Sequence, residues 1–132
     1  DIAYELARAS TYPSHARKAI LEMHHQVGDL ALDNQGIAQR GLLVRHLLMP
    51  NGLAGTESWM RFLSQEISTD TYLNIMDQYR PCYRAHDLDA ISRSISKQEY
   101  EKALAIAQEH GLTRLDDRQA RITLALHRLI GP

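Results

Sequence analysis

The fold is decided by one stretch, which reads Leu42-Leu43-Val44-Arg45-His46-Leu47-Leu48-Met49 and stops at Pro50-Asn51-Gly52. Apart from Arg45 and His46, every residue of the stretch before Pro50 is apolar. A run this apolar differs from a half-exposed antiparallel strand, in which apolar and polar residues alternate. We therefore expect a strand that is buried on both faces, as in a parallel sheet or a barrel.

The residues that follow carry helix and strand signals in turn. A helix is expected from Thr56 to about Ile67, with Thr56 as its N-cap and one apolar stripe that is buried. The stripe consists of Trp59, Phe62, Leu63 and Ile67. A second buried strand is expected at Tyr72–Met76, and a long loop from 77 to 95 follows it.

Beyond this loop, a capping box marks the start of another helix. Ser96 stands three residues before Glu99, the spacing at which each side chain satisfies a backbone N–H of the other residue. The helix is expected to run to His110 and to end at Gly111. Leu112–Leu115 then predicts a short last strand.

Two elements are expected before the deciding stretch. The first is a helix over 14–27 that ends at Gly28, which is placed to be its C-cap. Its apolar stripe consists of Ala16, Ala19, Ile20, Met23 and Val27. The second is a small β-hairpin over 30–40, in which Asn34 and Gly36 are expected to take the left-handed turn positions.

The order of these elements predicts an α/β fold. From residue 42 onward the order is strand, helix, strand, loop, helix, strand, which is typical of a parallel sheet covered by helices. About three strands are too few for a closed barrel or a full doubly wound sheet, so the chain reads as part of a larger fold. Residues 2–9 and the tail 118–132 are expected to be helical.

Composition narrows the class of protein. The chain has 132 residues, a net charge of −1 and one cysteine. A single cysteine excludes an internal disulfide framework, a Cys-rich zinc site and an iron–sulfur cluster bound by this chain alone, and it favours a cytoplasmic location. The scattered charges favour neither nucleic acid nor a membrane. The chain starts at Asp1 without a signal peptide, so we expect a processed chain or a piece of a longer one.

Arg45 and His46 are the anomaly within the deciding stretch. Adjacent strand residues point to opposite faces, so one of the two must face a cleft and the other the covering helices. A buried arginine is costly unless it is paired, so Arg45 is expected to bind a carboxylate or phosphate, or to pair with a carboxylate such as Asp29 or Asp33. His46 is expected to be a core histidine with a hydrogen-bond partner.

The remaining candidates are weaker. Polar residues follow both strands, at Asn51 after the first and at Asp77 to Arg80 after the second, where ligands of parallel α/β folds bind. None of the histidines has the spacing of a zinc motif. Cys82 lies between Arg80 and Arg84, which favour a reactive thiolate, although an ordinary loop cysteine is the preferred interpretation.

Four separated blocks, matched in order, resemble a known family. The chain is similar to the C-terminal half of radical S-adenosylmethionine proteins of the pyruvate formate-lyase-activating-enzyme-like group, in particular a bacterial branch. The blocks are Gln26-Val27-Gly28-Asp29-Leu30, Gly41-Leu42-Leu43-Val44-Arg45-His46-Leu47-Leu48-Met49-Pro50, Gly52-Leu53-Ala54-Gly55-Thr56-Glu57 and Asn74-Ile75-Met76-Asp77-Gln78-Tyr79-Arg80-Pro81. The resemblance covers residues 1–117, and 118–132 lie outside it.

The resemblance implies a partial (β/α) barrel whose cavity holds S-adenosylmethionine. It implies that Arg45 and Leu47 face that cavity, that His46 turns outward, and that Gln78 and Tyr79 lie on the adenine side of the cofactor. Family members also bind a [4Fe–4S] cluster through Cys-x-x-x-Cys-x-x-Cys, and no such motif is present here. The parent protein is therefore expected to be an oxidoreductase that abstracts hydrogen, with a glycine of a protein substrate as one candidate source. This chain alone is expected to be inactive and to hold neither cofactor.

A second hypothesis needs no reaction. A partial barrel leaves strand edges and an apolar wall open, so the chain would also suit a protein-interaction or small-ligand-binding α/β module that self-associates through those edges. A third hypothesis, a metal- or thiol-dependent hydrolase that uses the histidines and Cys82, has less support from the sequence.

Overall fold

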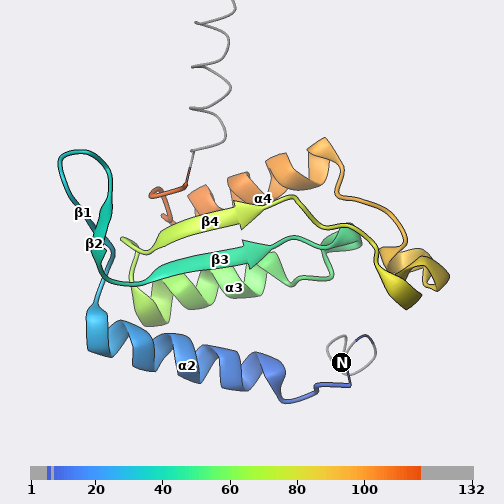
Figure 1. The fold of residues 1–132 in the computed structure, drawn as a ribbon, viewed down its shortest axis with the longest axis horizontal. Coiled ribbons are helices and arrows are strands. Elements are labelled where there is room, and N and C mark those ends of the chain that lie inside the picture. The colour runs from blue at the N-terminus through green and yellow to red at the C-terminus, as the bar shows by residue number, and fades with distance from the viewer. Residues whose placement is uncertain (1–5, 7, 117–132) are drawn as a thin grey trace, which may run out of the picture.

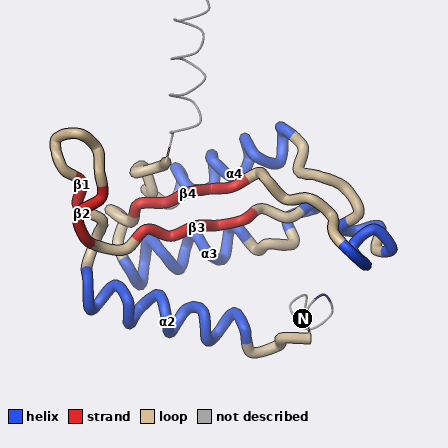
Figure 2. The backbone as a smooth tube through the Cα atoms, in the orientation of Figure 1, coloured by secondary structure: helices blue, strands red, loops and turns tan. Residues whose placement is uncertain are grey.

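A computed structural model describes residue 6 and residues 8–116 of the chain. The predicted helices over 2–9 and 118–132 fall mostly or wholly outside the described residues. The described α-helices and β-strands, in chain order, are α2 (Tyr12–Val27), β1 (Ala31–Leu32), β2 (Ala38–Arg40), β3 (Leu43–Leu47), α3 (Thr56–Phe62), β4 (Tyr72–Met76) and α4 (Lys97–Glu109). Figure 1 and Figure 2 show the resulting mixed α/β arrangement.

The central feature is the parallel pair of β3 and β4. The two strands are in register from Leu43 opposite Tyr72 to Leu47 opposite Met76, which confirms both predicted strands and their parallel pairing. Leu115 makes a parallel bridge to Leu73 on the other side of β4, where the sequence predicts a short third strand. Among the described residues the sheet remains open, so the predicted class of helices on parallel strands is confirmed while no closed barrel is formed.

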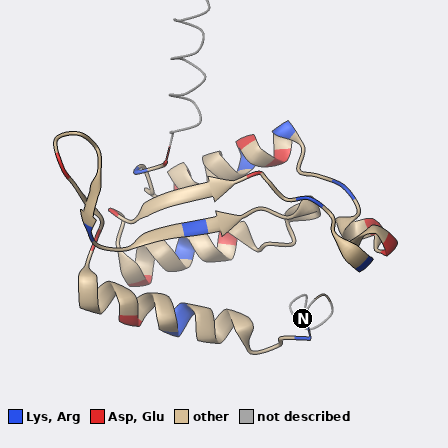
Figure 3. Ribbon diagram, viewed as in Figure 1, with Lys and Arg blue, Asp and Glu red and all other residues tan. Residues whose placement is uncertain are grey.

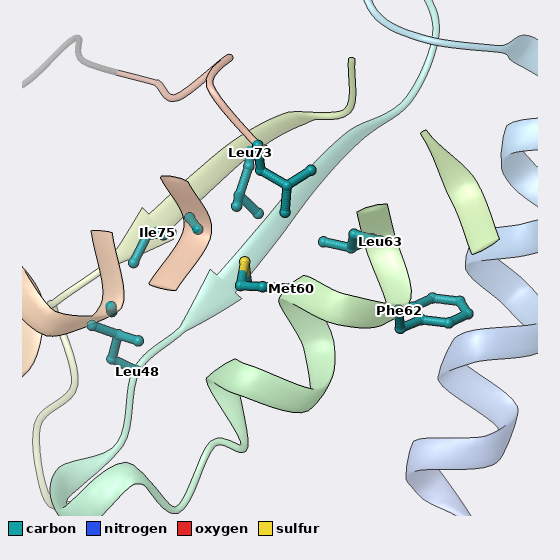
Figure 4. Close-up of a cluster of buried hydrophobic side chains, with 9 residues drawn as sticks. Leu48, Met60, Phe62, Leu63, Leu73 and Ile75 are labelled. Atoms are coloured by element: carbon teal, nitrogen blue, oxygen red, sulfur yellow. The ribbon is translucent and has the colours of Figure 1, made fainter. Parts of the chain in front are cut away.

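The core lies between this sheet and the helices α3 and α4, which lie behind it in Figure 1. Leu73 and Ile75 of β4 contribute to it from the sheet, and Met60 and Leu63 contribute from the helical side, as Figure 4 shows. Alanines at 103 and 107 let α4 approach closely because they add little bulk. The remaining buried members of the cluster are Leu48, Phe62 and Leu112.

The helix after β3 buries more than the predicted stripe. Met60 is fully buried although the sequence pattern omitted it. The reason is that this helix packs on two sides, because Met60 points toward the sheet while Trp59 and Phe62 lie under the guanidinium of Arg17 from α2, at 5.3 and 5.1 Å from their ring centres. The helix ends in a π-helical turn, Leu63–Ile67.

The expectation that β3 is buried on both faces is wrong. His46 is buried, whereas Arg45 is exposed and Leu47 remains 42% exposed. The helices cover one face of the sheet only, and no helix of the described part lies on the other (Figure 1). The apolar sequence of β3 therefore reflects a second face that the described residues do not cover.

Local signals mostly predict the helix ends correctly. The capping box of Ser96 and Glu99 is present with both of its hydrogen bonds, and Gly28 ends α2 with a φ of 70°. Thr56 is not an N-cap, because Gly55 occupies that position and Thr56 is the first residue of α3. Its hydroxyl contacts the imidazole of His46 instead.

The hairpin is confirmed as an antiparallel pair of β1 and β2. Gly36 takes the left-handed conformation with a φ of 77°, whereas Asn34 does not. The carboxylate of Asp33 supplies the missing constraint, because it accepts hydrogen bonds from the backbone N–H groups of Gln35 and Ile37, both at 2.9 Å. These bonds hold the pKa of Asp33 below its usual value.

No helix in the described part of the chain is long and apolar enough to cross a membrane.

Candidate functional site

The candidate site is the uncovered face of the parallel pair, which we call the bare face. Its residues toward the carboxyl ends are Arg45 and Leu47 from β3 and, directly opposite them, Asn74 and Met76 from β4. Each of the four remains at least partly exposed. Because side chains alternate along a strand, the residues between them point to the helices instead. The bare face thus carries one cation from its own strands, while the Asp116 carboxylate accepts from the Asn74 side chain at 3.1 Å and the Arg114 guanidinium lies over the Tyr72 ring.

Arg45 lacks the ion pair that the sequence left open. Within residues 8–116 it makes no hydrogen bond or ion pair. Figure 3 draws Lys and Arg in blue, and blue is present on the strand β3. The two carboxylates expected as partners are engaged elsewhere. Asp29 accepts from Ser68 at 2.9 Å and lies 3.1 Å from His24, and Asp33 is held in its own turn. The guanidinium of Arg45 is therefore free to bind an anion with two parallel hydrogen bonds.

His46 points to the opposite face and is a core histidine, as expected. Its Nε2 lies 3.0 Å from the hydroxyl oxygen of Thr56 at the start of α3, and only 9% of its surface is exposed. Burial disfavours the charged imidazolium and lowers its pKa from 6.5 to about 4. A neutral, hydrogen-bonded imidazole in this position ties β3 to α3.

One edge of β3 has no partner strand among the described residues. The backbone N–H of Leu48 donates to the carbonyl of Met76 at 2.9 Å, so it points toward β4. Peptide groups of alternate strand residues point to opposite edges, so those of Arg45 and Leu47 point away from β4. Arg45 and Leu47 therefore present their side chains on the bare face and their peptide groups at the unpaired edge of β3, which we call the free edge.

The other two predicted site residues follow the end of β4. Gln78 is exposed, while Tyr79 is half-buried and its hydroxyl donates to the carbonyl of Ile91 at 2.8 Å. The structure thus brings Arg45 and Leu47 together on the bare face and places Gln78 and Tyr79 just beyond the carboxyl end of the neighbouring strand. Cys82, in the same loop, is exposed.

A cluster of polar residues beyond the carboxyl ends of β3 and β4 was not predicted from the sequence. We call Asn51, Arg93 and Glu99 the edge cluster. Arg93 makes a bidentate pair with Glu99, with N–O distances of 2.7 and 2.9 Å, and also donates to the Asn51 side-chain oxygen at 2.9 Å. The Asn51 backbone N–H donates to Glu99 at 2.7 Å. The sequence marked Asn51 only as a polar residue in a turn and Glu99 only as a capping-box residue, and neither signal reveals that the two meet across 48 positions.

Two hollows of the described residues lie away from the part of the bare face that carries Arg45. One, of about 530 Å³, lies on the helical side between α3 and α4, with Leu48, Thr56 and Ala103 among its lining residues. The other, of about 580 Å³, lies beside the hairpin and includes Ile37 and Tyr72. In the part of the chain that is described, no three His, Cys, Asp or Glu residues are grouped to hold a metal ion.

Comparisons with known proteins point to one relative. No protein-family model and no solved structure matches the chain. The chain is similar to an uncharacterized protein of Methanocaldococcus jannaschii, with 37% identity over 82 residues. The aligned region is 61% of this chain and 24% of the relative, so the chain spans about a quarter of the length of the curated relative that it matches.

Proposed function

We propose that this chain is the C-terminal part of a radical S-adenosylmethionine enzyme similar to pyruvate formate-lyase-activating enzyme, and that the bare face is one wall of its cofactor cavity. The observation that carries the proposal is the exposed Arg45 on this face, without a partner among the described residues. An arginine in the middle of an apolar strand is costly unless an anion or solvent satisfies it. A bound carboxylate would supply the missing partner.

Each predicted residue has a distinct role in the proposal. The guanidinium of Arg45 binds the carboxylate of S-adenosylmethionine, because a planar fork of donors matches its two oxygens. Leu47 provides an apolar wall beside it. Gln78 hydrogen-bonds the edge of the adenine, and the ring of Tyr79 stacks on its face. The hydroxyl of Tyr79 is bonded within the loop, which leaves its ring as the contacting group.

Three open surfaces support the inference that further strands of the parent complete a barrel. The free edge of β3 offers unpaired peptide groups, and the bare face lacks a cover in the described part. Helix α2 has no fully buried residue, and Met23 and Val27 on its apolar stripe are more than 40% exposed. The relative is also about four times longer than the aligned region. An upstream strand would pair with the free edge of β3, and the remaining strands and helices of a barrel would enclose the bare face and pack against α2.

The iron–sulfur cluster does not fit this chain. A site-differentiated [4Fe–4S] cluster needs three thiolates, and the chain has one cysteine, Cys82, which is exposed in a loop. The thiolates must therefore come from sequence outside these residues. In the parent, the cluster would supply the electron that cleaves S-adenosylmethionine, and the resulting radical would abstract hydrogen from the substrate, for which a protein glycine is one candidate.

The proposal is tested first on the gene and then on the parent protein. The upstream reading frame is expected to encode Cys-x-x-x-Cys-x-x-Cys, and a reading frame that starts at this chain without that motif would overturn the proposal. In the parent, isothermal titration with S-adenosylmethionine should show that Arg45→Gln weakens binding by about tenfold or more, because a charge-assisted pair is lost. The matched control is Arg61→Gln on α3, which should leave the affinity unchanged.

A second function is favoured by the free edge of β3. An unpaired strand edge beside an uncovered face is a template for another chain, so the fragment would serve as an interaction module that pairs with a second copy. Sedimentation of the isolated chain tests this second function. A concentration-dependent dimer that Leu47→Lys abolishes would favour the module, and a monomer at all concentrations would exclude it.

A further inference from the structure

The edge cluster joins three segments that are distant in the chain. Asn51 lies in the turn directly after β3, Arg93 in the loop between β4 and α4, and Glu99 in the first turn of α4. Glu99 is the hub, because its two oxygens accept from both terminal nitrogens of Arg93 and from the backbone N–H of Asn51. The same carboxylate accepts from Ser96 in the capping box. Helix α4 is thereby hydrogen-bonded to the turn after β3 and to the loop after β4, both of which lie at the carboxyl ends of the strands.

The geometry of Asn51 shows how far this arrangement constrains the chain. Asn51 has a φ of 60°, in the left-handed region that residues with a Cβ rarely adopt. In that conformation its backbone N–H reaches Glu99 while its side chain bonds Arg93 and donates to the carbonyl of Ala90 at 2.8 Å. Asn51 alone therefore joins the turn after β3 to two residues of the loop after β4, Ala90 and Arg93.

The constrained part of this loop also holds Tyr79. The carbonyl of Ile91, next to Ala90, accepts the hydrogen bond from the Tyr79 hydroxyl. Ile91 is buried, so it is a fixed anchor for this hydrogen bond. A continuous path thus runs from α4 through Glu99 and Asn51 to the 90–91 segment, and from there to the ring of Tyr79.

Electrostatics favours a closed cluster. The bidentate pair with Arg93 and the N–H groups of Ser96 and Asn51 hold the pKa of Glu99 far below its usual range, so Glu99 stays charged at any physiological pH. The side chain of Glu99 is only 24% exposed and that of Arg93 46%. A bidentate arginine pair with additional backbone donors is stronger than an isolated surface ion pair.

We infer that Asn51, Arg93 and Glu99 are positioning residues that hold the 77–95 loop at the carboxyl edge and thereby orient Tyr79 toward the ligand of the bare face. The identity of that ligand as S-adenosylmethionine rests on the proposed function. The restraint that the edge cluster places on the loop does not depend on the identity of the ligand, and it can be measured without any ligand.

The first experiment measures the loop in the chain itself. Cys82 is exposed and is the sole cysteine, so a nitroxide attached to it reports the mobility of the loop without further cysteine substitutions. Glu99→Gln retains a capping-box residue but loses the charged pair with Arg93. Asn51→Gly retains the left-handed backbone but loses both side-chain bonds. Both substitutions should shift the nitroxide spectrum toward its mobile component.

The matched control is Glu101→Gln, one turn of α4 away from the loops, where Glu101 forms an exposed pair with Lys97 at 3.5 Å. It should leave the spectrum unchanged. Hydrogen exchange provides a second measurement, because the amide of Ile91, which donates to Leu88 at 2.9 Å, should exchange about tenfold faster when the cluster is broken. An unchanged spectrum and unchanged exchange in both cluster variants would overturn the inference.

The second experiment uses the parent protein and S-adenosylmethionine. Glu99→Gln and Tyr79→Phe, which removes the bond to Ile91 but keeps the ring, should both weaken binding severalfold. A looser loop with unchanged affinity would overturn the orienting role of the cluster. If the unsubstituted parent binds no S-adenosylmethionine, the proposed function fails, and the mobility result still decides whether the cluster holds the loop.

Discussion

His46 makes the stability of this protein depend on pH in a way that can be calculated. The imidazole is 9% exposed, and its pKa falls from 6.5 to about 4 on folding because burial disfavours the charged form. A group whose pKa is lowered by folding binds fewer protons in the native state than in the unfolded state. Its contribution is therefore fully present above pH 6.5 and is lost as the pH falls from 6.5 toward 4.

The size of the effect follows from linkage. A difference of one pKa unit corresponds to about 1.4 kcal/mol, so the loss approaches about 3 kcal/mol below pH 4 and is about 2 kcal/mol between pH 8 and pH 5. For a domain of this size, that is a substantial part of a typical stability of about 5–15 kcal/mol. Moderately acidic solution should therefore destabilise the chain measurably.

The assay is urea unfolding at pH 8 and pH 5, in the original protein and in His46→Gln. The chain has seven histidines, and the comparison of the two proteins removes the contributions of the others. Glutamine does not titrate and can still bond Thr56. His46→Gln should lose about 2 kcal/mol less than the original protein between the two pH values. Equal losses in both proteins would refute the argument that His46 is buried in its neutral form.

Two further predictions concern packing. Met60→Ala should destabilise the fold by about 3 kcal/mol in urea unfolding, because Met60 is fully buried, whereas Met23→Ala at a 44% exposed site should cost less than about 0.5 kcal/mol. Gly41→Ala should cost about 2–4 kcal/mol, because a Cβ there would collide with the backbone carbonyl of Asp29, while Gly36→Ala, with open space around it, should cost about 1 kcal/mol. Similar losses within either pair would contradict the packing described here.

Sequence reasoning was most successful where the signal was local. The parallel strand at Tyr72–Met76, the capping box of Ser96 and the C-cap at Gly28 all follow from neighbours a few positions apart. Alternation along β3 also predicted that Arg45 and His46 would separate onto opposite faces. Thr56 is not an N-cap, because Gly55 takes that position, and the Thr56 hydroxyl contacts His46 instead, a partner that no local pattern reveals.

Local patterns in the sequence predicted only part of the candidate site. The two-residue period of a strand predicted that Arg45 and Leu47 share one face of β3. It did not predict that this face would be left uncovered by the described helices. The edge cluster was inaccessible, because Asn51 is separated from Arg93 by 42 positions and from Glu99 by 48. Such pairs form only after β3, β4 and α4 are placed side by side.

The sequence by itself determined the type and order of the elements, because periodicity, caps and turn residues act within one or two turns of the chain. It also limited the chemistry, since one cysteine cannot hold an iron–sulfur cluster. The tertiary structure decided which face of β3 packs against helices, which carboxylates are already engaged, and which residues fix the 77–95 loop. These are long-range matters of burial and pairing, which depend on how distant segments meet.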